Sequence, residues 1–333
     1  MELTSQFIET FTKLANKSAL LSFDAEPTVY DKIFKLVNVD DEFGGLDHGQ
    51  GTEILGATEP TEMTSTMMDH KFSDTGEGWS YYWKLRYFQD GFQFDQNTLK
   101  NWGANDQYAS SRIDERSKNL GEAFQRFRDR FAANLFNRGA ITAGDKTVMD
   151  GTYQSLQTDP QPGKIYTGFP FLYTAHPLKR AAGTTFQNHY ASLSFSGSNL
   201  ETALTRYRVT NAKGELNEEI MNEPNVLVYN PTIDMDVERI LKSTLEPGTA
   251  NNAVNPLQGR VQPIPWHKLS TTTAWALGKR QRGIWFLHRG APKTQTVVDK
   301  FKGLGVISFS MTDEIGVCVT QWRDWMGANF PTT

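Results

Sequence analysis

One run of the chain, residues 106–138, has the pattern of a single long amphipathic helix, and its length restricts the folds open to the rest. Apolar side chains recur on one helical face at spacings of three, four and seven residues: Ile113, Leu120, Phe124, Phe127, Phe131 and Leu135. At ~1.5 Å per residue such a helix is roughly 50 Å long, whereas an average helix has about 11–12 residues. The stripe covers only about three heptads and uses Phe in place of Leu or Ile, which favours a rod packed on a sheet over a coiled-coil strand.

The first 43 residues begin with an amphipathic pattern. Leu3, Phe7, Phe11 and Leu14 follow one another at spacings of three to four residues, as on one face of a helix. Acidic residues stand where an export signal would be basic, so the segment does not have the pattern of a signal peptide. We expect residues 1–43 to form an N-terminal arm, disordered or exchange-labile in the free subunit because its apolar face needs a partner.

Residues 44–98 predict an extended two-stranded ribbon. A loop rich in Gly and Thr leads into two strand-like runs, 61–72 and 79–88, separated by the turn sequence SDTGEG. The second run carries a series of aromatic side chains that includes Trp79, Tyr81, Trp83 and Tyr87. Because an isolated hairpin is marginal in water, these rings need another surface to cover them.

The second half of the chain alternates short helices and strands. A polar helix over about 199–211 is followed by the strand-like NVLVYN and by a helix, 231–243, that starts with proline. Short strands follow, and the final segment predicts two strands around a turn at Asp313–Gly316.

The loop at 245–260 has an unusual composition. It holds no charge from Pro247 to Gly259, and it contains three asparagines, Asn251, Asn252 and Asn255. Ordinary surface loops are interrupted by Lys, Glu or Asp, so this loop requires a particular explanation.

Composition and motifs exclude several classes of protein. The net charge of −4 gives no global attraction to nucleic acid, and no apolar run is long enough to span a bilayer. The only cysteine, Cys318, permits no intrachain disulfide, which fits a reducing compartment.

Candidate catalytic residues have plainer explanations. The six histidines have no zinc-ligand spacing, and the sequence contains neither a Walker loop nor a Gly-x-Ser-x-Gly elbow. Gly49-Gln50-Gly51 resembles part of a dinucleotide loop but lacks the surrounding strand–helix unit. Asp234, Asp236 and Glu238 suit a helix N-terminus. We therefore expect no catalytic, cofactor or metal site.

The last third of the chain carries a family resemblance. The strand–Pro–helix of residues 225–243, the loop ending NPLQGR, the run TTTAWALGKRQRGIWFLHRGAP and the closing FSMTDEIGVCVTQWRDWMGAN resemble tailed-bacteriophage (Caudoviricetes) major capsid proteins. The group most similar is the Mu-type major head subunit, and GFPFLYTAHPL at 168–178 also resembles a segment of that group. Residues 1–100 match in layout only.

The resemblance implies the α+β coat fold of the Hong Kong phage type. Its parts would be the following: an N-terminal arm at 1–43, an extended loop at 44–98, a peripheral domain at 99–195 with a spine helix at 106–138, an axial domain at 196–298 and C-terminal strands at 299–333 that return to the peripheral domain. The aromatic ribbon, with Trp79, Tyr81, Trp83 and Tyr87, would lie across a neighbouring subunit. The amides of Asn251, Asn252 and Asn255 would face their own copies at the capsomer axis, where a repeated charge would repel itself.

The resemblance also implies a structural role and a set of partners. The chain would assemble with itself into hexamers and pentamers of an icosahedral virion shell, built in the bacterial cytoplasm, with no enzymatic activity and no membrane. The shell would enclose double-stranded DNA by non-specific contact and engage a portal and scaffolding or decoration proteins. Two alternatives stay open: an encapsulin-like compartment and a soluble enzyme with a cryptic site.

Overall fold

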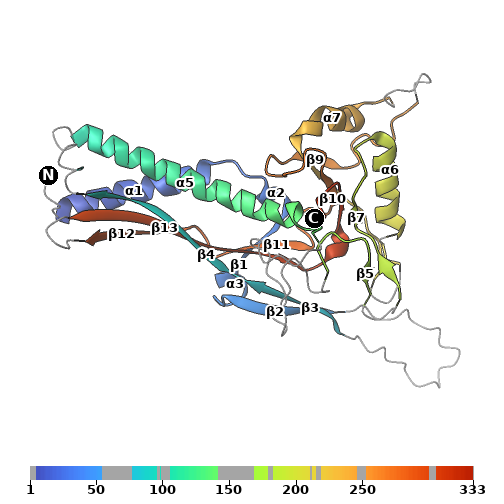
Figure 1. The fold of residues 1–333 in the computed structure, drawn as a ribbon, viewed down its shortest axis with the longest axis horizontal. Coiled ribbons are helices and arrows are strands. Elements are labelled where there is room, and N and C mark those ends of the chain that lie inside the picture. Colours follow the sequence, from blue (N-terminus) through green and yellow to red (C-terminus); the bar gives the residue numbers. More distant parts are fainter. Residues whose placement is uncertain are drawn as a thin grey trace, which may run out of the picture.

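The computed structural model shows an elongated limb joined to a second, more compact part (Figure 1). Helices α1 and α5 lie over long strands in the limb, while α6 and α7 flank the strands of the compact part. The structure describes residues 5–54, 77–95, 98, 106–141, 169–178, 183–210, 212–214, 219–245, 253–299 and 305–332. Within them, no helix is long and apolar enough to cross a membrane.

The long helix is confirmed: α5 spans Asp106–Asn137. Helix α1 (Ser5–Ala25) runs beside it, and the two bury apolar side chains against each other and against the sheet below, among them Phe11, Ala15, Ala19, Leu120 and Phe124. Their backbones come very close, because a Cβ built on Gly121 would lie 2.1 Å from the carbonyl oxygen of Ala19. The amphipathic N-terminal helix is therefore present, but the expectation that its apolar face lacks a partner in the free subunit is wrong for residues 5–25.

The sheet of the limb is organised around one long strand. Strand β13 (Val306–Val319) pairs with β11 (Ile284–His288), β12 (Lys293–Asp299) and β4 (Arg86–Asp95), and β1 (Lys35–Asn38) pairs with β11 in parallel. The expected turn at Asp313–Gly316 is wrong, because the strand continues through it. Asp313 is buried in an ion pair with Arg128, and a Cβ on Gly316 would lie 2.4 Å from the carbonyl oxygen of Lys84. These two residues serve tertiary packing in place of a turn.

The second sheet lies in the compact part. Its described strands follow the order β7 (His189–Tyr190), β14 (Trp325–Ala328), β10 (Trp275–Gly278), β8 (Val226–Tyr229) and β9 (Gln262–Pro265). The membership of this sheet differs from the expected axial domain, residues 196–298, in two ways. Strands β11 and β12, assigned above to the axial domain, pair within the limb, whereas β14, assigned to the returning strands, joins this sheet.

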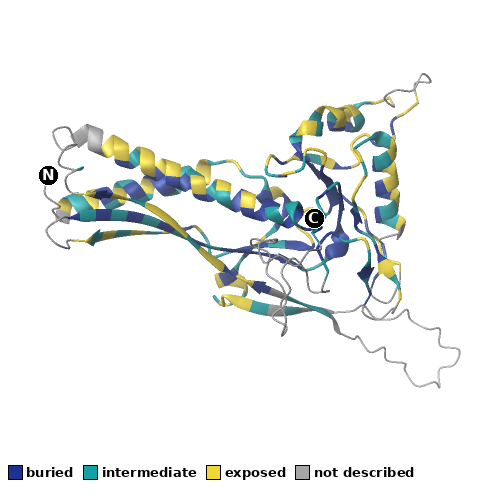
Figure 2. Cartoon of the chain, viewed as in Figure 1, coloured by how far each residue is buried: buried dark blue, intermediate teal, exposed yellow. Residues whose placement is uncertain are grey.

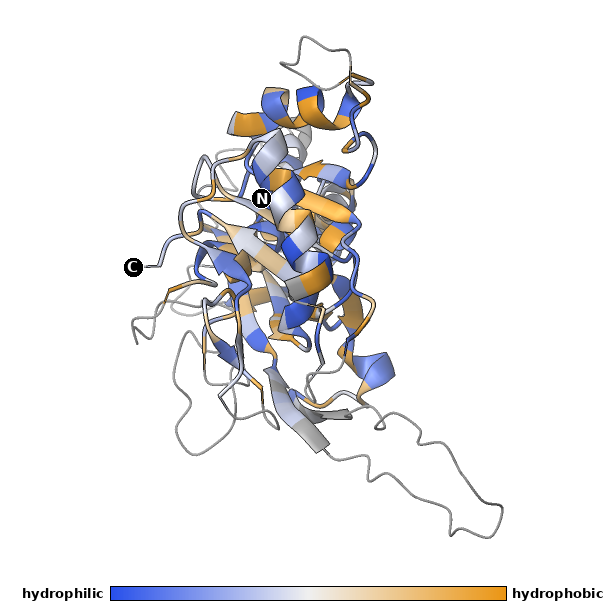
Figure 3. Ribbon diagram, turned by 90° about the vertical axis from the view of Figure 1, so that its right-hand side faces the viewer, coloured by the Kyte–Doolittle hydropathy of each residue, from blue (hydrophilic) through white to orange (hydrophobic). Residues whose placement is uncertain are grey.

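Helices α6 (Gly197–Thr205) and α7 (Asp234–Lys242) pack on this second sheet, and each has a local signal for its start. The Ser196 hydroxyl accepts from the amide of Asn199, and the Asn230 side chain accepts from the amide of Thr232 in the short turn η2 (Pro231–Ile233) before α7. A short π-helix, η1 (Arg206–Thr210), extends α6. The helix at the top of Figure 3, α7, carries hydrophobic and hydrophilic residues on different faces, consistent with its buried Val237 and Leu241.

Strands β2 (His48–Ile54) and β3 (Glu77–Lys84) form a separate antiparallel pair, called the ribbon below. The described partner of β3 is 48–54, which the sequence pattern indicated as a loop. The strand expected at 61–72 lies within residues 55–76, outside the described part.

The remaining described elements are short: α2 (Tyr30–Ile33), α3 (Val39–Glu42), β5 (His176–Pro177), β6 (Thr185–Phe186) and η4 (Trp322–Asp324).

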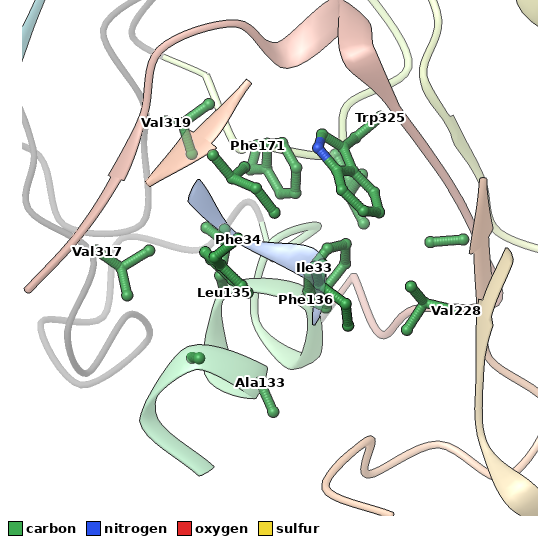
Figure 4. Close-up of a cluster of buried hydrophobic side chains, with 14 of the residues drawn as sticks. Ile33, Phe34, Ala133, Leu135, Phe136, Phe171, Val228, Val317, Val319 and Trp325 are labelled. Atoms are coloured by element: carbon green, nitrogen blue, oxygen red, sulfur yellow. The ribbon is translucent and has the colours of Figure 1, made fainter. Parts of the chain in front are cut away.

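A continuous aromatic core lies where limb and compact part meet. Phe136, near the end of α5, contacts four rings edge-to-face at centroid distances of 5.2–6.3 Å: Phe34, Trp266, Phe171 and Trp325. Figure 4 shows Phe34, Phe136, Phe171 and Trp325 gathered between α5 and the strands, and Figure 2 shows the buried residues concentrated at this junction. The core fixes how the rod meets the second sheet.

Candidate assembly surfaces

The ribbon owes its local geometry to two glycines. Gly49 and Gly51 on β2 stand opposite Trp83 and Tyr81 on β3. A Cβ on Gly49 would lie 2.5 Å from the Trp83 ring, and one on Gly51 would lie 2.2 Å from the Tyr81 ring. Only glycine leaves room for these rings to fold over the partner strand. The Gly-Gln-Gly sequence therefore serves cross-strand packing.

Trp83 is covered by its own subunit. Its ring lies 4.6 Å from that of Phe43, and it packs in a buried cluster with Leu85, Leu287 and Cys318. Only 2% of the residue is exposed. The expectation that Trp83 binds a neighbouring subunit is therefore corrected: burial inside the chain leaves this ring no free face.

The other aromatic residues of the ribbon region are less covered. Tyr81 is half-buried, with its ring edge-to-face on Trp285 at 5.6 Å, and Trp79 is also half-buried. Tyr87, at the start of β4, is 58% exposed. Its hydroxyl donates a hydrogen bond to the carboxylate of Asp47. This hydrogen bond is the main cause of the lowered pKa of Asp47, and a second hydrogen bond, from Arg289, lowers it further. Tyr87 is the ring of this set with the most surface left for a partner.

The base of the 246–252 loop is held by Asn255. The side-chain amide of this buried residue donates to the carbonyl oxygens of Ile240 at 2.6 Å and Ser243 at 2.9 Å, and its oxygen accepts from the Leu257 amide at 3.0 Å. Asn255 therefore anchors the loop to the end of α7, and the expectation that its amide faces other copies is corrected. Asn251 and Asn252 lie outside the described residues.

Exposed apolar side chains lie on the two sides of this loop and on α7. Leu245 and Val254 form an antiparallel bridge on its two sides, and both are exposed. Met235 on α7 is 73% exposed. Beside it, a groove of about 390 Å³ lies between the start of α6 and α7, with Glu201, Asp236 and Arg239 among its lining residues. This end of the compact part combines apolar and charged surface.

A second groove lies on the limb. It has a volume of about 280 Å³ and runs between β4 and α5, and its lining includes three aromatic and two charged residues: Phe88, Phe124, Phe127, Asp90 and Arg130. The Phe88 and Phe127 rings meet edge-to-face at 4.7 Å.

Cys318 and the three acidic residues of α7 that the sequence singled out serve packing or local pairing. Cys318 is buried, which raises the pKa of its thiol well above the ordinary value. Asp234 accepts a hydrogen bond from the Tyr229 hydroxyl at 2.5 Å, Asp236 pairs with Arg239, and Glu238 pairs with Lys242. Among the described residues, no group of three or more His, Cys, Asp or Glu side chains could hold a metal ion.

A charged junction at the foot of the ribbon was missed by sequence reasoning. Arg289, just after β11, contacts Asp40, Asp47 and Glu314. Two of these partners are more than two hundred residues away in the sequence, so no local spacing could have indicated the group.

Comparison with solved structures gives matches along nearly the whole chain. The Mycobacterium phage Patience structure is 10% identical with a TM-score of 0.52, and the match covers 99% of this chain and 91% of the other. The capsid of the native GTA particle is 14% identical with a TM-score of 0.48, covering 95% and 91%. The procapsid of bacteriophage JBD30 is 11% identical with a TM-score of 0.46, covering 99% and 77%.

No curated protein matches the sequence. The family model described as phage capsid protein matches residues 85–328, a span that includes β4, α5 and both sheets. The chain therefore belongs to the phage capsid protein family.

Proposed function

We propose that this capsid protein is the major head subunit, which assembles with itself into hexamers and pentamers of an icosahedral shell around double-stranded phage DNA. The family match over residues 85–328 carries the proposal, because it spans the limb and the second sheet together. The fold supports it as well. A rod-like limb and a ribbon that pairs apart from both sheets suit contacts between many copies better than they suit an enclosed catalytic pocket.

The ribbon supplies one contact in this proposal. Tyr81, Trp79 and above all Tyr87 keep exposed ring surface, which a neighbouring subunit would cover, while Trp83 holds the ribbon to its own chain.

The compact part supplies the contact around the symmetry axis. The uncharged loop with Asn251 and Asn252 would face its copies, and exposed Leu245, Val254 and Met235 would be covered beside it. Asn255 belongs to the support of that loop.

The partners beyond the chain itself follow from the same role. The acidic net charge supports only weak, non-specific contact with packaged DNA, and a portal with scaffolding or decoration proteins would complete the head. Membership of the Mu-type group remains a prediction. The capsid family match does not favour an enzyme with a cryptic site.

Expression of the chain alone, followed by negative-stain microscopy and light scattering, tests the proposal. Closed shells or capsomer rings are the expected result, and a monodisperse monomer at every concentration and salt would contradict it. An encapsulin-like compartment is the second outcome to be separated. Particles isolated from the natural source should contain double-stranded DNA, and a protein cargo without DNA would favour the compartment instead.

A further inference from the structure

Arg289 joins four segments of the chain at the foot of the ribbon. Its Nε lies 2.9 Å from Oδ1 of Asp40 in an ion pair. Its Nη2 donates to the carbonyl oxygen of Gly45 at 2.5 Å and to Asp47 at 3.0 Å, and its Nη1 donates to Glu314 at 2.5 Å. Only 14% of the Arg289 side chain and 10% of the Glu314 side chain are exposed, so water competes weakly for the contact between these two residues. Asp40 and Asp47 are about half exposed.

The contacts of Arg289 reach two different parts of the subunit, the limb sheet and the segment that leads into the ribbon. Glu314 belongs to β13, the long strand of the limb sheet. Asp40 lies on α3, and Gly45 and Asp47 lie in the turn that leads into β2. Gly45 has a left-handed backbone, with φ at 78°, so its carbonyl is presented by a conformation that favours glycine. Arg289 therefore links the sheet to the segment that enters the ribbon.

Both strands of the ribbon leave the subunit at this point. The Leu85 amide, directly after β3, donates to the Asp47 carbonyl oxygen at 2.7 Å, directly before β2. Among the described strands, β2 pairs with β3 alone. Ladder hydrogen bonds to the limb sheet therefore do not reach β2 directly. On the β3 side of the ribbon, Trp83 packs against Leu287 and Cys318, and on the β2 side the contacts of Arg289 hold the turn that leads into the strand.

The charges at this junction suit an arginine. Arg289 faces three carboxylates, those of Asp40, Asp47 and Glu314, and a second cation, the exposed Lys293, lies 3.5 Å from Glu314. A guanidinium offers five donors in a plane and can serve several acceptors at fixed angles, whereas an ammonium group acts as a single point charge.

We propose that Arg289 is a positioning residue that fixes the direction in which the β2–β3 ribbon leaves the subunit. Its importance for shells rests on the proposed function, because a ribbon with one fixed direction reaches the same place on every neighbour. The direction itself is a property of the single chain and can be measured without assembly.

The test uses the unassembled full-length chain with spin labels on Ser80→Cys in β3 and Gln295→Cys in β12. The native Cys318 is buried, so it should not take the label. Electron-electron double resonance should give one narrow distance distribution in the parent, and Arg289→Ala should lose that single peak. Arg289→Lys should restore it only in part. Lys293→Ala, which removes the exposed cation beside Glu314, should keep the parent distribution.

An Arg289→Ala distribution as narrow as the parent's and at the same distance would overturn the proposal. If Arg289→Ala does not fold, as judged by circular dichroism, Asp47→Ala removes one ribbon-side contact and should broaden the distribution in its place; no broadening there would equally count against it. Shell formation is scored separately by microscopy. A parent chain that forms no shells would contradict the proposed function while leaving the distance test of Arg289 intact.

Discussion

The guanidinium of Arg128 makes two hydrogen bonds to the carboxylate of Asp313, one from Nε at 2.7 Å and one from Nη2 at 2.6 Å. Both residues are buried, and they join α5 to β13 across 185 positions of sequence. The next residue on the helix, Asp129, accepts from the amides of Val29 and Tyr30 and from the indole of Trp266. Two consecutive helix residues thus tie the rod to the limb sheet and to the junction core.

Breaking the buried pair should destabilise the subunit strongly. Asp313→Ala leaves the Arg128 charge buried without its partner, and we expect the free energy of unfolding to fall by about 3–5 kcal/mol. The double variant Arg128→Met with Asp313→Leu should lose less, because no charge is left unpaired. Urea denaturation measures both. Arg112→Ala, at an exposed pair with Glu115, is the control and should change stability by less than about 0.5 kcal/mol. Equal losses in the single and double variants would mean that the unpaired charge is not the cause.

Trp83 and Tyr87 should separate folding from assembly. Trp83→Ala removes a ring from the core and should lower the free energy of unfolding by about 3–5 kcal/mol. Tyr87→Ala should change stability by less than about 1 kcal/mol and yet reduce shell formation, because its ring is exposed in the free subunit. Denaturation and light scattering at matched concentrations check the two effects. If Tyr87→Ala lowers stability and Trp83→Ala impairs only shell formation, Tyr87 is the core residue and Trp83 the assembly residue.

Acid should destabilise the subunit through two buried histidines. Burial lowers the pKa of His176 to about 3 and that of His189 to about 4, from an ordinary value of 6.5. The unfolded chain therefore binds protons that the folded chain does not, so the stabilisation is complete above about pH 6.5 and is lost as the pH falls toward the folded values. Each of the two histidines should lower the free energy of unfolding by about 1.4 kcal/mol for each pH unit of acidification in that window.

Urea titrations between about pH 7 and about pH 5 give this slope. His176→Phe keeps a ring to stack on Trp322, whose centroid lies 4.0 Å from the imidazole, and removes one titrating group. The slope of the variant should be shallower than that of the parent by about one proton. Parallel curves for the two proteins would show that His176 does not titrate on unfolding.

A charge in the uncharged loop should impair capsomers and leave the fold intact. Asn252→Asp would place five or six like charges around one axis, each close pair costing about 1–4 kcal/mol, less as salt rises. Assembly should therefore be poor at low salt and recover at high salt, as followed by light scattering. Asn255→Asp is the matched comparison: it removes the donors to Ile240 and Ser243, so it should destabilise the subunit itself and salt should not rescue it. Wild-type assembly by Asn252→Asp at all salt concentrations would remove Asn252 from the axis.

The local sequence pattern was sufficient to predict an element when the signal lies on one face of that element. The stripe from Ile113 to Leu135 predicted α5 to within a residue, and Pro231 correctly marked the start of the turn before α7. It failed where residues act at a distance. Gly49 and Gly51 look like loop residues until Trp83 and Tyr81 are placed across the strand pair.

The same limit explains the other errors. Asp313 and Gly316 have the composition of a turn. The sequence does not show that Asp313 pairs with Arg128 or that the backbone of Lys84 approaches Gly316 closely. Asn255 has the composition of an exposed amide, but its donors are taken by the end of α7. Arg289 carries no local signal, since its partners come together only in the folded chain.

The position of β13 has a consequence for how the protein is made. Strands β4, β11 and β12 all pair with it, and β14, which follows it, completes the second sheet between β7 and β10. More than three hundred residues must leave the ribosome before Val306 appears, so β4, β11 and β12 each lack their β13 partner while the chain is being made. Neither described sheet can therefore be completed until β13 and β14 have been synthesised.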